Sequence, residues 1–212
     1  MRLPILYSFK RCPYAIRARM ALILGSKSCQ IREVELKNKP DQMLKISPKG
    51  TVPVLKIEDT VIDESLEIIS WAMKSQPSKA HQFTKREQLK SFKLIKLFDS
   101  EFKFHLDRYK YSSRFDTDPK THRKECKILL EDLDLQINSF PWIFGKKVSL
   151  LDISILPFIR QCKIANPDWF NSQNFTKVIA LLNHFENSNL FKIAMQKYDL
   201  WDPNNPIEMI FP

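Results

Sequence analysis

A cysteine near the start of the chain has neighbours that suit it to nucleophilic chemistry. Cys12 is followed by Pro13, and proline is favoured in the first turn of a helix. The pair predicts a thiol at a helix N-terminus, where the backbone N–H groups and the helix dipole favour the reactive thiolate. Lys10, Arg11 and Arg17 add positive charge nearby. The competing interpretation is a small buried hydrophobic residue, and this pair alone does not decide between the two.

A second motif is Val52-Pro53, which follows a Gly50-Thr51 turn and opens a predicted strand. A cis bond before Pro53 would turn the N–H and C=O of Val52 outward, where they could pair with an extended peptide. The competing interpretation is a trans proline at a strand start, which the general rarity of cis bonds favours.

A third motif, Asp63-Glu64-Ser65, stands at the start of a predicted helix. The exposed N–H groups of a helix start suit a carboxylate. The Ser65 hydroxyl can donate a hydrogen bond, and Glu64 can accept one from an ammonium group. Simple N-capping by Asp63 or Ser65 is the competing interpretation.

The elements that carry these motifs alternate between strand and helix in residues 1–76. Strands are predicted at 3–7, 30–36, 54–57 and 60–62, and helices at 13–24, 40–46 and 64–73. A βαβ unit followed by a hairpin and a helix is the arrangement of a thioredoxin-like domain. Residues 77–84 read as a linker, and residues 85–212 as an all-helical domain.

The helical half carries its own local signals. A long amphipathic helix is predicted from Lys85 to about Arg114, and Ser149-x-x-Asp152 predicts a capping box for a later helix containing Pro157. The predicted inner face of the long helix combines apolar residues at helical spacing: Leu89, Phe92, Ile95, Phe98, Phe102, Leu106 and Tyr109.

Four short segments and the capping box together resemble the cytosolic glutathione transferases, most closely their omega class. The segments occur in that family's order and approximate spacing: Cys12-Pro13-Tyr14-Ala15, Lys37-Asn38-Lys39-Pro40, Val52-Pro53-Val54-Leu55 and Glu64-Ser65. The resemblance covers nearly the whole chain, and it is strong only at these islands. It implies a glutathione transferase fold, with an α/β thioredoxin-like N-terminal domain and an all-α C-terminal domain.

The resemblance also implies roles for individual residues. Cys12 would be the catalytic thiol. Glutathione would bind at Pro13, Tyr14, Lys39, Val52, Pro53, Glu64 and Ser65. In that scheme Val52, before a cis Pro53, pairs with the cysteinyl unit, Glu64 and Ser65 hold the γ-glutamyl end, and Lys39 approaches the glycyl carboxylate.

The implied reaction is thiol–disulfide exchange with glutathione as co-substrate, in a thioltransferase or dehydroascorbate reductase type of enzyme. Ala15 stands where glutaredoxins carry a second cysteine, so an outside thiol would have to release the product. Two alternatives stay open: conjugation of glutathione to an electrophile, with Cys12 only a neighbour, and a non-catalytic binding or regulatory protein of this fold. Tyr109 and the aromatics near Trp169 are candidates for lining a co-substrate pocket in the helical domain.

Composition argues against several other classes of protein. No apolar run approaches the ~18–20 residues of a spanning helix, and the dispersed histidines and four irregularly spaced cysteines predict neither a zinc site nor a disulfide framework. The net charge of +10 is divided evenly between residues 1–76 and the remainder, which argues against a nucleic-acid site. Only three glycines occur, too few for a nucleotide-binding loop. A cytoplasmic protein without a metal is expected, and the resemblance adds a homodimer.

Overall fold

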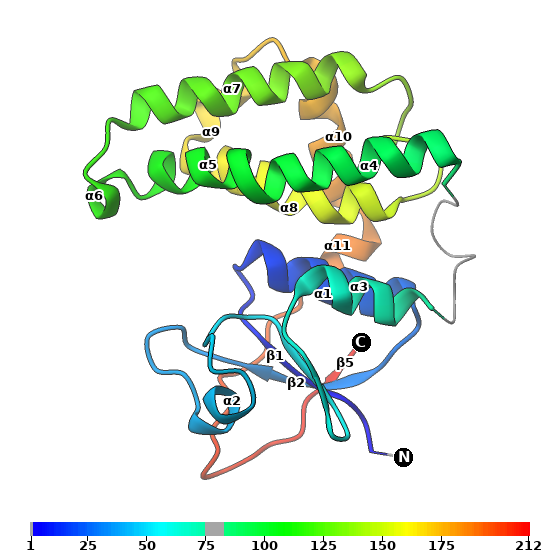
Figure 1. Cartoon of the computed structure of the whole chain (residues 1–212), viewed down its shortest axis with the longest axis vertical. Helices are drawn as coiled ribbons and strands as arrows, with labels where there is room; N and C mark the ends of the chain where they lie inside the picture. The colour runs from blue at the N-terminus through cyan, green and yellow to red at the C-terminus, as the bar shows by residue number, and fades with distance from the viewer. Residues whose placement is uncertain (1, 75–82) are drawn as a thin grey trace. The chain divides into compact units, whose positions relative to one another are not determined.

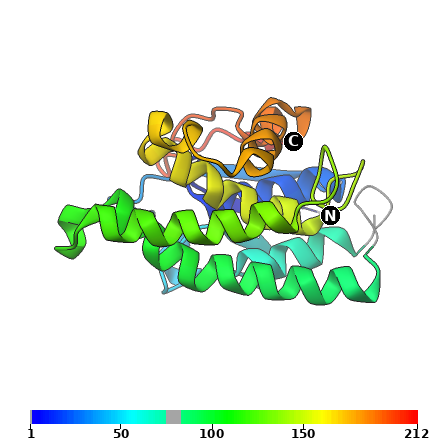
Figure 2. The same ribbon diagram turned by 90° about the horizontal axis from the view of Figure 1, so that it is seen from above.

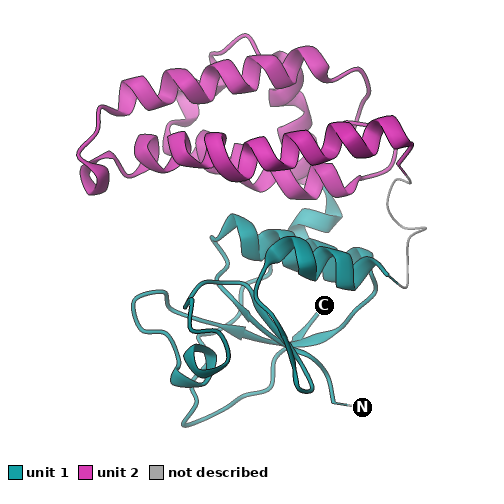
Figure 3. Ribbon diagram, viewed as in Figure 1, with its two compact units in different colours: residues 1–79, 188–212 teal, residues 80–187 magenta. Residues whose placement is uncertain are grey.

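The computed structural model describes residues 2–74 and 83–212. It divides into two compact units (Figure 3): residues 1–79 with 188–212 form unit 1, and residues 80–187 form unit 2. The predicted linker at 77–84 lies mostly outside the described residues, so that boundary stays a prediction.

Unit 1 is built on a five-stranded mixed sheet with the order β4-β3-β1-β2-β5. Strand β1 pairs in parallel with β2 and antiparallel with β3. The strands are β1 (Ile5–Ser8), β2 (Cys29–Glu33), β3 (Val54–Ile57), β4 (Thr60–Ile62) and β5 (Ile210–Phe211). The helices of this unit are α1 (Pro13–Leu24), α2 (Asp41–Ile46), α3 (Ser65–Met73) and α11 (Asn189–Ala194). The order from β1 to α3 is βαβαββα, as the thioredoxin-like prediction requires.

The two faces of the sheet are covered by different helices, because side chains alternate along each strand. Leu6 lies opposite Ile31 and Leu55 in the register, and all three are buried. Helices α1 and α3 run side by side along one side of the sheet, and α2 lies on the other (Figure 1). Gly25 ends α1, and a Cβ there would stand 2.2 Å from the carbonyl oxygen of Ala72, so only glycine allows this approach of the two helices.

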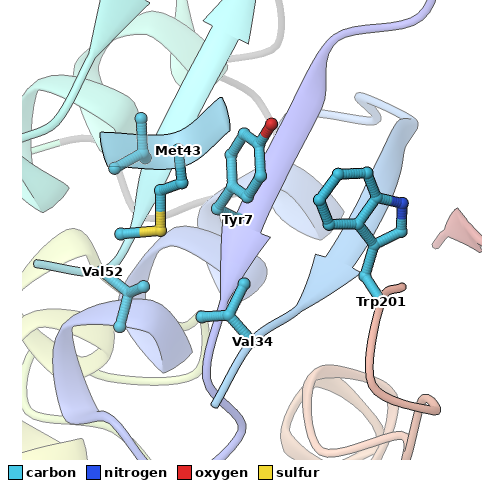
Figure 4. Packing of buried hydrophobic residues seen from close by; sticks show 6 residues of the cluster. Tyr7, Val34, Met43, Val52 and Trp201 are labelled. Carbon is cyan, nitrogen blue, oxygen red and sulfur yellow. The ribbon is translucent and has the colours of Figure 1, made fainter. Parts of the chain in front are cut away.

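A hydrophobic cluster fills the face of the sheet near α2 (Figure 4). Its buried members come from β1 and β3, the residue after β2, α2, the loop before β3 and the C-terminal segment: Tyr7, Val34, Met43, Val52, Val54 and Trp201. Cys12 packs against the edge of this cluster. The cluster therefore joins the start of α1, the loop carrying Val52 and the end of the chain in one packed layer.

The C-terminal segment differs from the prediction that residues 85–212 form an all-helical domain. Residues 188–212 belong to unit 1, where β5 pairs antiparallel with β2 and the Trp201 N–H donates to the Glu33 carbonyl at 2.8 Å. The Trp201 ring meets Tyr7 edge-on at 6.0 Å. A two-residue strand in a Pro- and Asn-rich tail has no periodicity to reveal it, since its pairing partner lies far away in the sequence.

Unit 2 consists of helices. They are α4 (Lys85–Leu97), a π-helical turn η2 (Phe98–Phe102), α5 (Lys103–Lys110), α6 (Ser112–Phe115), α7 (Pro119–Gln136), α8 (Leu150–Ala165), α9 (Pro167–Asn171) and α10 (Thr176–Asn187). Seen from above, α4, η2 and α5 run as one rod along α7 (Figure 2). Helix α8 continues through Pro157 and is buried along most of its length. No helix within the described ranges is long and apolar enough to span a membrane.

The predicted inner face of the long helix is wrong in its first half. Phe98, Phe102 and Leu106 are buried, but Leu89 and Phe92 are 67% and 69% exposed. Leu89 stands nine residues before Phe98, which places the two side chains on opposite sides of a straight α-helix. The buried residues of α4 are instead Ser91 and Leu94, which lie on the same side as Phe98. The predicted inner face therefore combined side chains from two sides of the helix.

Candidate active site

Cys12 is the N-cap residue of α1, with Pro13 in the first helical position. Its φ of −76° and ψ of 123° are those of an extended residue entering a helix, and its side chain makes no capping hydrogen bond. The backbone N–H donates to the Phe9 carbonyl at 2.9 Å, and the Sγ donates to the Val52 carbonyl at 3.6 Å. The thiol is thus held at the positive end of a helix, against the loop before β3.

The other three cysteines are in environments that suppress reactivity. Cys29, Cys126 and Cys162 are fully buried, whereas Cys12 is partly exposed, and all four are free thiols. Burial raises the pKa of Cys29 to about 12. A hydrogen bond with Cys126 and burial raise the pKa of Cys162 well above its ordinary value. A neutral thiol is a poor nucleophile, so Cys12 is the cysteine placed for chemistry.

The loop from Ser47 to Pro53 connects the predicted site residues. The Val52–Pro53 bond is cis, as the resemblance predicts. Gly50 has a φ of +60°, and the Gly50 N–H donates to the Ser47 carbonyl at 3.0 Å. The Lys39 side chain lies across this turn, since its Nζ would be 3.9 Å from a Cβ placed on Gly50. A residue larger than glycine would be strained in this backbone and would press against the Leu44 side chain.

The start of α3 holds the third motif. Glu64 is the N-cap residue and makes no side-chain capping bond, so capping by Asp63 or Ser65 is not what the structure shows. Ser65 is buried, and Arg17 donates to its Oγ at 3.5 Å. The Arg17 guanidinium, itself fully buried, also lies 5.3 Å from the centre of the Tyr14 ring.

The structure therefore connects the predicted residues in pairs within unit 1. Cys12 meets Val52, Lys39 lies against Gly50 of the same loop, and Ser65 meets Arg17 of α1. Glu64 is joined to this loop by Lys49, whose Nζ is 2.7 Å from its Oε1. Tyr109 and Trp169 belong to unit 2, where their rings meet edge-on at 5.9 Å, and their role in a co-substrate pocket stays a prediction.

Lys49 and Ser47 were missed by the sequence interpretation. The Lys49 Nζ also lies 3.0 Å from Asp63 Oδ1, and the Ser47 hydroxyl donates to Asp63 Oδ2 at 2.8 Å. The hydrogen bond from Ser47, then that from Lys49, lowers the pKa of Asp63. The signal available in the sequence was a Ser-x-Lys turn ahead of an acidic pair, which is too common to point to a site by itself.

A buried ion pair behind the site was also missed. Arg19 of α1 pairs with Glu33 at the end of β2, and its Nε donates to the Ser8 hydroxyl at 2.9 Å. Glu33 accepts from the Lys10 N–H at 2.5 Å, which fixes the loop leading to Cys12. Burial raises the pKa of Glu33 and lowers that of Arg19, while their mutual attraction opposes both shifts. Arg19 also donates to the carbonyls of Ala194 and Gln196, so this pair links the Cys12 loop to the C-terminal segment.

The site contains thiol, hydroxyl and ionic groups. No group of three or more His, Cys, Asp or Glu side chains within residues 2–74 and 83–212 is arranged to hold a metal. The arrangement places a partly exposed thiol beside the loop before β3 and an ionic cluster at the next helix start.

Comparison with known proteins agrees with this arrangement. Residues 6–80 match the family model for the glutathione S-transferase N-terminal domain. Glutathione S-transferase DHAR3, chloroplastic, of Arabidopsis thaliana is 27% identical over 158 residues, covering 73% of this chain and 56% of the relative. The probable glutathione S-transferase DHAR2, chloroplastic, of Oryza sativa subsp. japonica is 28% identical over 154 residues, covering 73% and 53%. The chain thus spans little more than half the length of these curated relatives.

Solved structures share the fold over almost the whole chain. Glutathione transferase Omega 3C from Trametes versicolor superposes with a TM-score of 0.77 at 17% identity, covering 94% of this chain and 92% of that one. A glutathione transferase family member from Pseudomonas fluorescens pf-5, solved with two glutathione bound, gives 0.77 at 16% identity and 92% coverage of each. Residues 6–80 thus match the N-terminal domain model of the glutathione S-transferases, and almost the whole chain has the fold of these solved glutathione transferase structures.

Proposed function

We propose that this protein is a cysteine-type glutathione-dependent thioltransferase in which Cys12 carries glutathione as a mixed disulfide. The observation that carries this proposal is the placement of Cys12: the one partly exposed thiol of four, at the N-terminus of α1. A helix N-terminus favours the thiolate, which is the attacking form. The names of the curated relatives and of the matched family support the same ligand, glutathione.

The proposed reaction has two exchanges. The Cys12 thiolate attacks the glutathione sulfur of a glutathionylated substrate, the substrate thiolate leaves and takes a proton, and a Cys12–glutathione disulfide forms. A second glutathione thiolate then attacks the glutathione sulfur of that disulfide, releasing oxidised glutathione and restoring the Cys12 thiolate. Reduction of dehydroascorbate would use the same thiol and consume two glutathione molecules.

The need for an outside thiol follows from the positions of the other cysteines. Position 15 is alanine, and Cys29 lies buried in β2. Cys126 and Cys162 are buried in helices of unit 2. Glutathione itself is therefore the proposed resolving thiol.

The proposed glutathione site uses the loop before β3 and the start of α3. The backbone of Val52 would pair with the cysteinyl unit, Glu64 would accept from the γ-glutamyl ammonium, and Ser65 would donate to the γ-glutamyl carboxylate. Lys39 would approach the glycyl carboxylate, with Pro13 and Tyr14 completing the wall beside Cys12. A homodimer, a cytoplasmic location and a disulfide or electrophile as second substrate remain predictions.

Conjugation by an activating hydroxyl has less support. Tyr7 is buried and its hydroxyl accepts from Arg32 at 2.6 Å. Ser8 is fully buried and accepts from Arg19 at 2.9 Å. Both residues that could replace Cys12 as activator are thus buried, and each hydroxyl accepts a hydrogen bond from an arginine.

The test is to expose the protein to oxidised glutathione and map adducts by mass spectrometry. One glutathione adduct on Cys12 is expected, with Cys126→Ala as the matched control that keeps it and Cys12→Ala as the variant that loses it. Adducts found only on Cys29, Cys126 or Cys162 would overturn the assignment. Turnover of a chlorinated aromatic acceptor that Cys12→Ala leaves intact would favour conjugation, and no glutathione binding at millimolar concentration would favour a non-catalytic protein.

A further inference from the structure

Lys49 contacts Glu64, the carboxylate that is proposed to accept a hydrogen bond from the γ-glutamyl ammonium of glutathione. Lys49 Nζ lies 2.7 Å from Glu64 Oε1 and 3.0 Å from Asp63 Oδ1. The Lys49 and Glu64 side chains are 50% and 61% exposed, whereas Asp63 is only 26% exposed. One ammonium therefore bridges two carboxylates at the start of α3, in contact with solvent.

The bridge is anchored on its Asp63 side. Asp63 also accepts from the Ser47 hydroxyl at 2.8 Å, and its pKa is lowered by Ser47 and Lys49, so it stays ionised. The pKa of Lys49 is raised by its hydrogen bonds to Glu64 and Asp63, so the ammonium stays protonated. Asp63 can keep its bond to Lys49 while Glu64 changes partner, because an ammonium group has three donors.

The backbone that presents Lys49 is fixed by the turn that serves the rest of the site. The Gly50 N–H donates to the Ser47 carbonyl at 3.0 Å, and Val52 of the same loop accepts from the Cys12 Sγ. The loop that carries Val52 thus also positions the Lys49 side chain beside Glu64. There Lys49 forms an ion pair with the Glu64 carboxylate.

We propose that Lys49 is a specificity-determining residue that competes with the ligand's own ammonium group for Glu64. This inference rests on the proposed function, in which Glu64 accepts from the γ-glutamyl ammonium. A ligand with a free ammonium must displace Lys49 from Glu64, whereas a ligand whose amine is blocked gains nothing from that displacement. Lys49 therefore weakens the binding of glutathione. It also reduces the difference in affinity between glutathione and analogues whose amine is blocked.

The experiment compares the binding of two ligands by titration calorimetry at low salt. Glutathione and N-acetylglutathione are titrated into the wild type, Lys49→Met and the control Lys45→Met, which removes an exposed lysine on α2. Lys49→Met is expected to bind glutathione about two- to fivefold more tightly, the range expected for one exposed ion pair. Its affinity for N-acetylglutathione should change only as much as in Lys45→Met, which reports the general loss of positive charge.

Three further measurements test whether the ion pair between Lys49 and Glu64 causes the change in affinity. Lys49→Gln should show the same gain in glutathione affinity as Lys49→Met. When Glu64→Gln is also present, Lys49→Met should give no gain, because the carboxylate for which Lys49 and the ligand's ammonium compete is absent. High salt should shrink the gain, since it screens the exposed pair.

The outcomes are distinguishable. If the wild type binds glutathione and Lys49→Met binds it equally or more weakly, the competition is overturned and the proposed function stands. An equal gain for both ligands would also overturn it, since the ammonium would then play no part. If neither the wild type nor any Lys49 variant binds glutathione, the proposed function fails and this inference fails with it.

Discussion

Two helices of this protein begin in opposite ways. Helix α1 begins at Cys12, whose side chain makes no capping bond, with no acidic residue in its first turn. Helix α8 begins at Ser149, which forms a complete capping box with Asp152, both fully buried. Asp152 accepts from the Ser149 N–H at 2.7 Å and from the Ile143 N–H at 3.0 Å.

The difference separates a helix start used for structure from one suited to chemistry. At α8 the side chains saturate the positive end of the helix and join it to the preceding loop, which stabilises unit 2. At α1 the stabilising cap is replaced by a thiol, leaving the helix dipole to act on the sulfur. Loss of capping energy is the cost of a reactive residue at that position.

The largest expected effect comes from giving α1 an ordinary cap. Cys12→Ser should reduce thioltransferase turnover by about a thousandfold or more, because a hydroxyl is a poor nucleophile. It should also raise the free energy of unfolding by up to ~1 kcal/mol, since serine is a favoured N-cap residue. Steady-state kinetics and urea unfolding measure the two effects.

The control for Cys12→Ser is Cys12→Ala, which should lose the same activity without the gain in stability. Activity retained in both variants would remove Cys12 from the mechanism. A loss of stability in Cys12→Ser would contradict the cap comparison.

The second expectation concerns the α8 start. Asp152→Ala should lower the free energy of unfolding by ~2–4 kcal/mol, because it removes the cap and leaves the buried Ile143 N–H without its acceptor. Urea unfolding followed by circular dichroism measures it. Asp152→Asn keeps one carbonyl acceptor and should lower the free energy of unfolding by less. An equal decrease in the two variants would argue against the hydrogen-bond explanation.

Asp152 also makes the stability depend on pH. Burial raises its pKa to about 6, against the opposing hydrogen bonds from Ser149 and Ile143, while in the unfolded chain an aspartate has a pKa of ~3.9. Between these values the folded state holds the extra proton, so the contribution of Asp152 to stability falls as pH rises from about 4 to about 6 and is constant above. Unfolding at several pH values should show the wild type losing stability relative to Asp152→Asn within that window. A difference that does not vary with pH would contradict this.

The smallest expected effect belongs to a capping box in contact with solvent. Thr84 and Glu87 cap α4 reciprocally, with the Thr84 N–H donating to Glu87 at 2.8 Å, but Thr84 is exposed and Glu87 is only partly buried. Thr84→Ala should cost ~1 kcal/mol or less of unfolding free energy, since water replaces the lost bonds. A cost equal to that of Asp152→Ala would show that burial is not what separates the two boxes.

Local signals predicted much of this protein. The order of strands and helices in residues 1–76 is confirmed, and it was predictable because each element carries its own periodicity. The Ser149–Asp152 capping box is also confirmed, and it was predictable because its two partners are three residues apart. The helix start at Cys12-Pro13 was recognisable for the same reason. The buried face of the helix from Lys85 was not recognisable, because large apolar residues occur on two sides of that helix and only the packing decides which side is buried.

The sequence by itself determined the elements, the capping residues and the position of a thiol at a helix start, since these depend on neighbours within a few residues. Only the tertiary structure decided which distant charges meet. The Arg19–Glu33 pair, the Lys49 bridge to Asp63 and Glu64, and the pairing of β5 with β2 join residues 14 to about 180 positions apart. Such contacts are selected by burial and by the geometry of the folded sheet, and no local pattern in the chain records them.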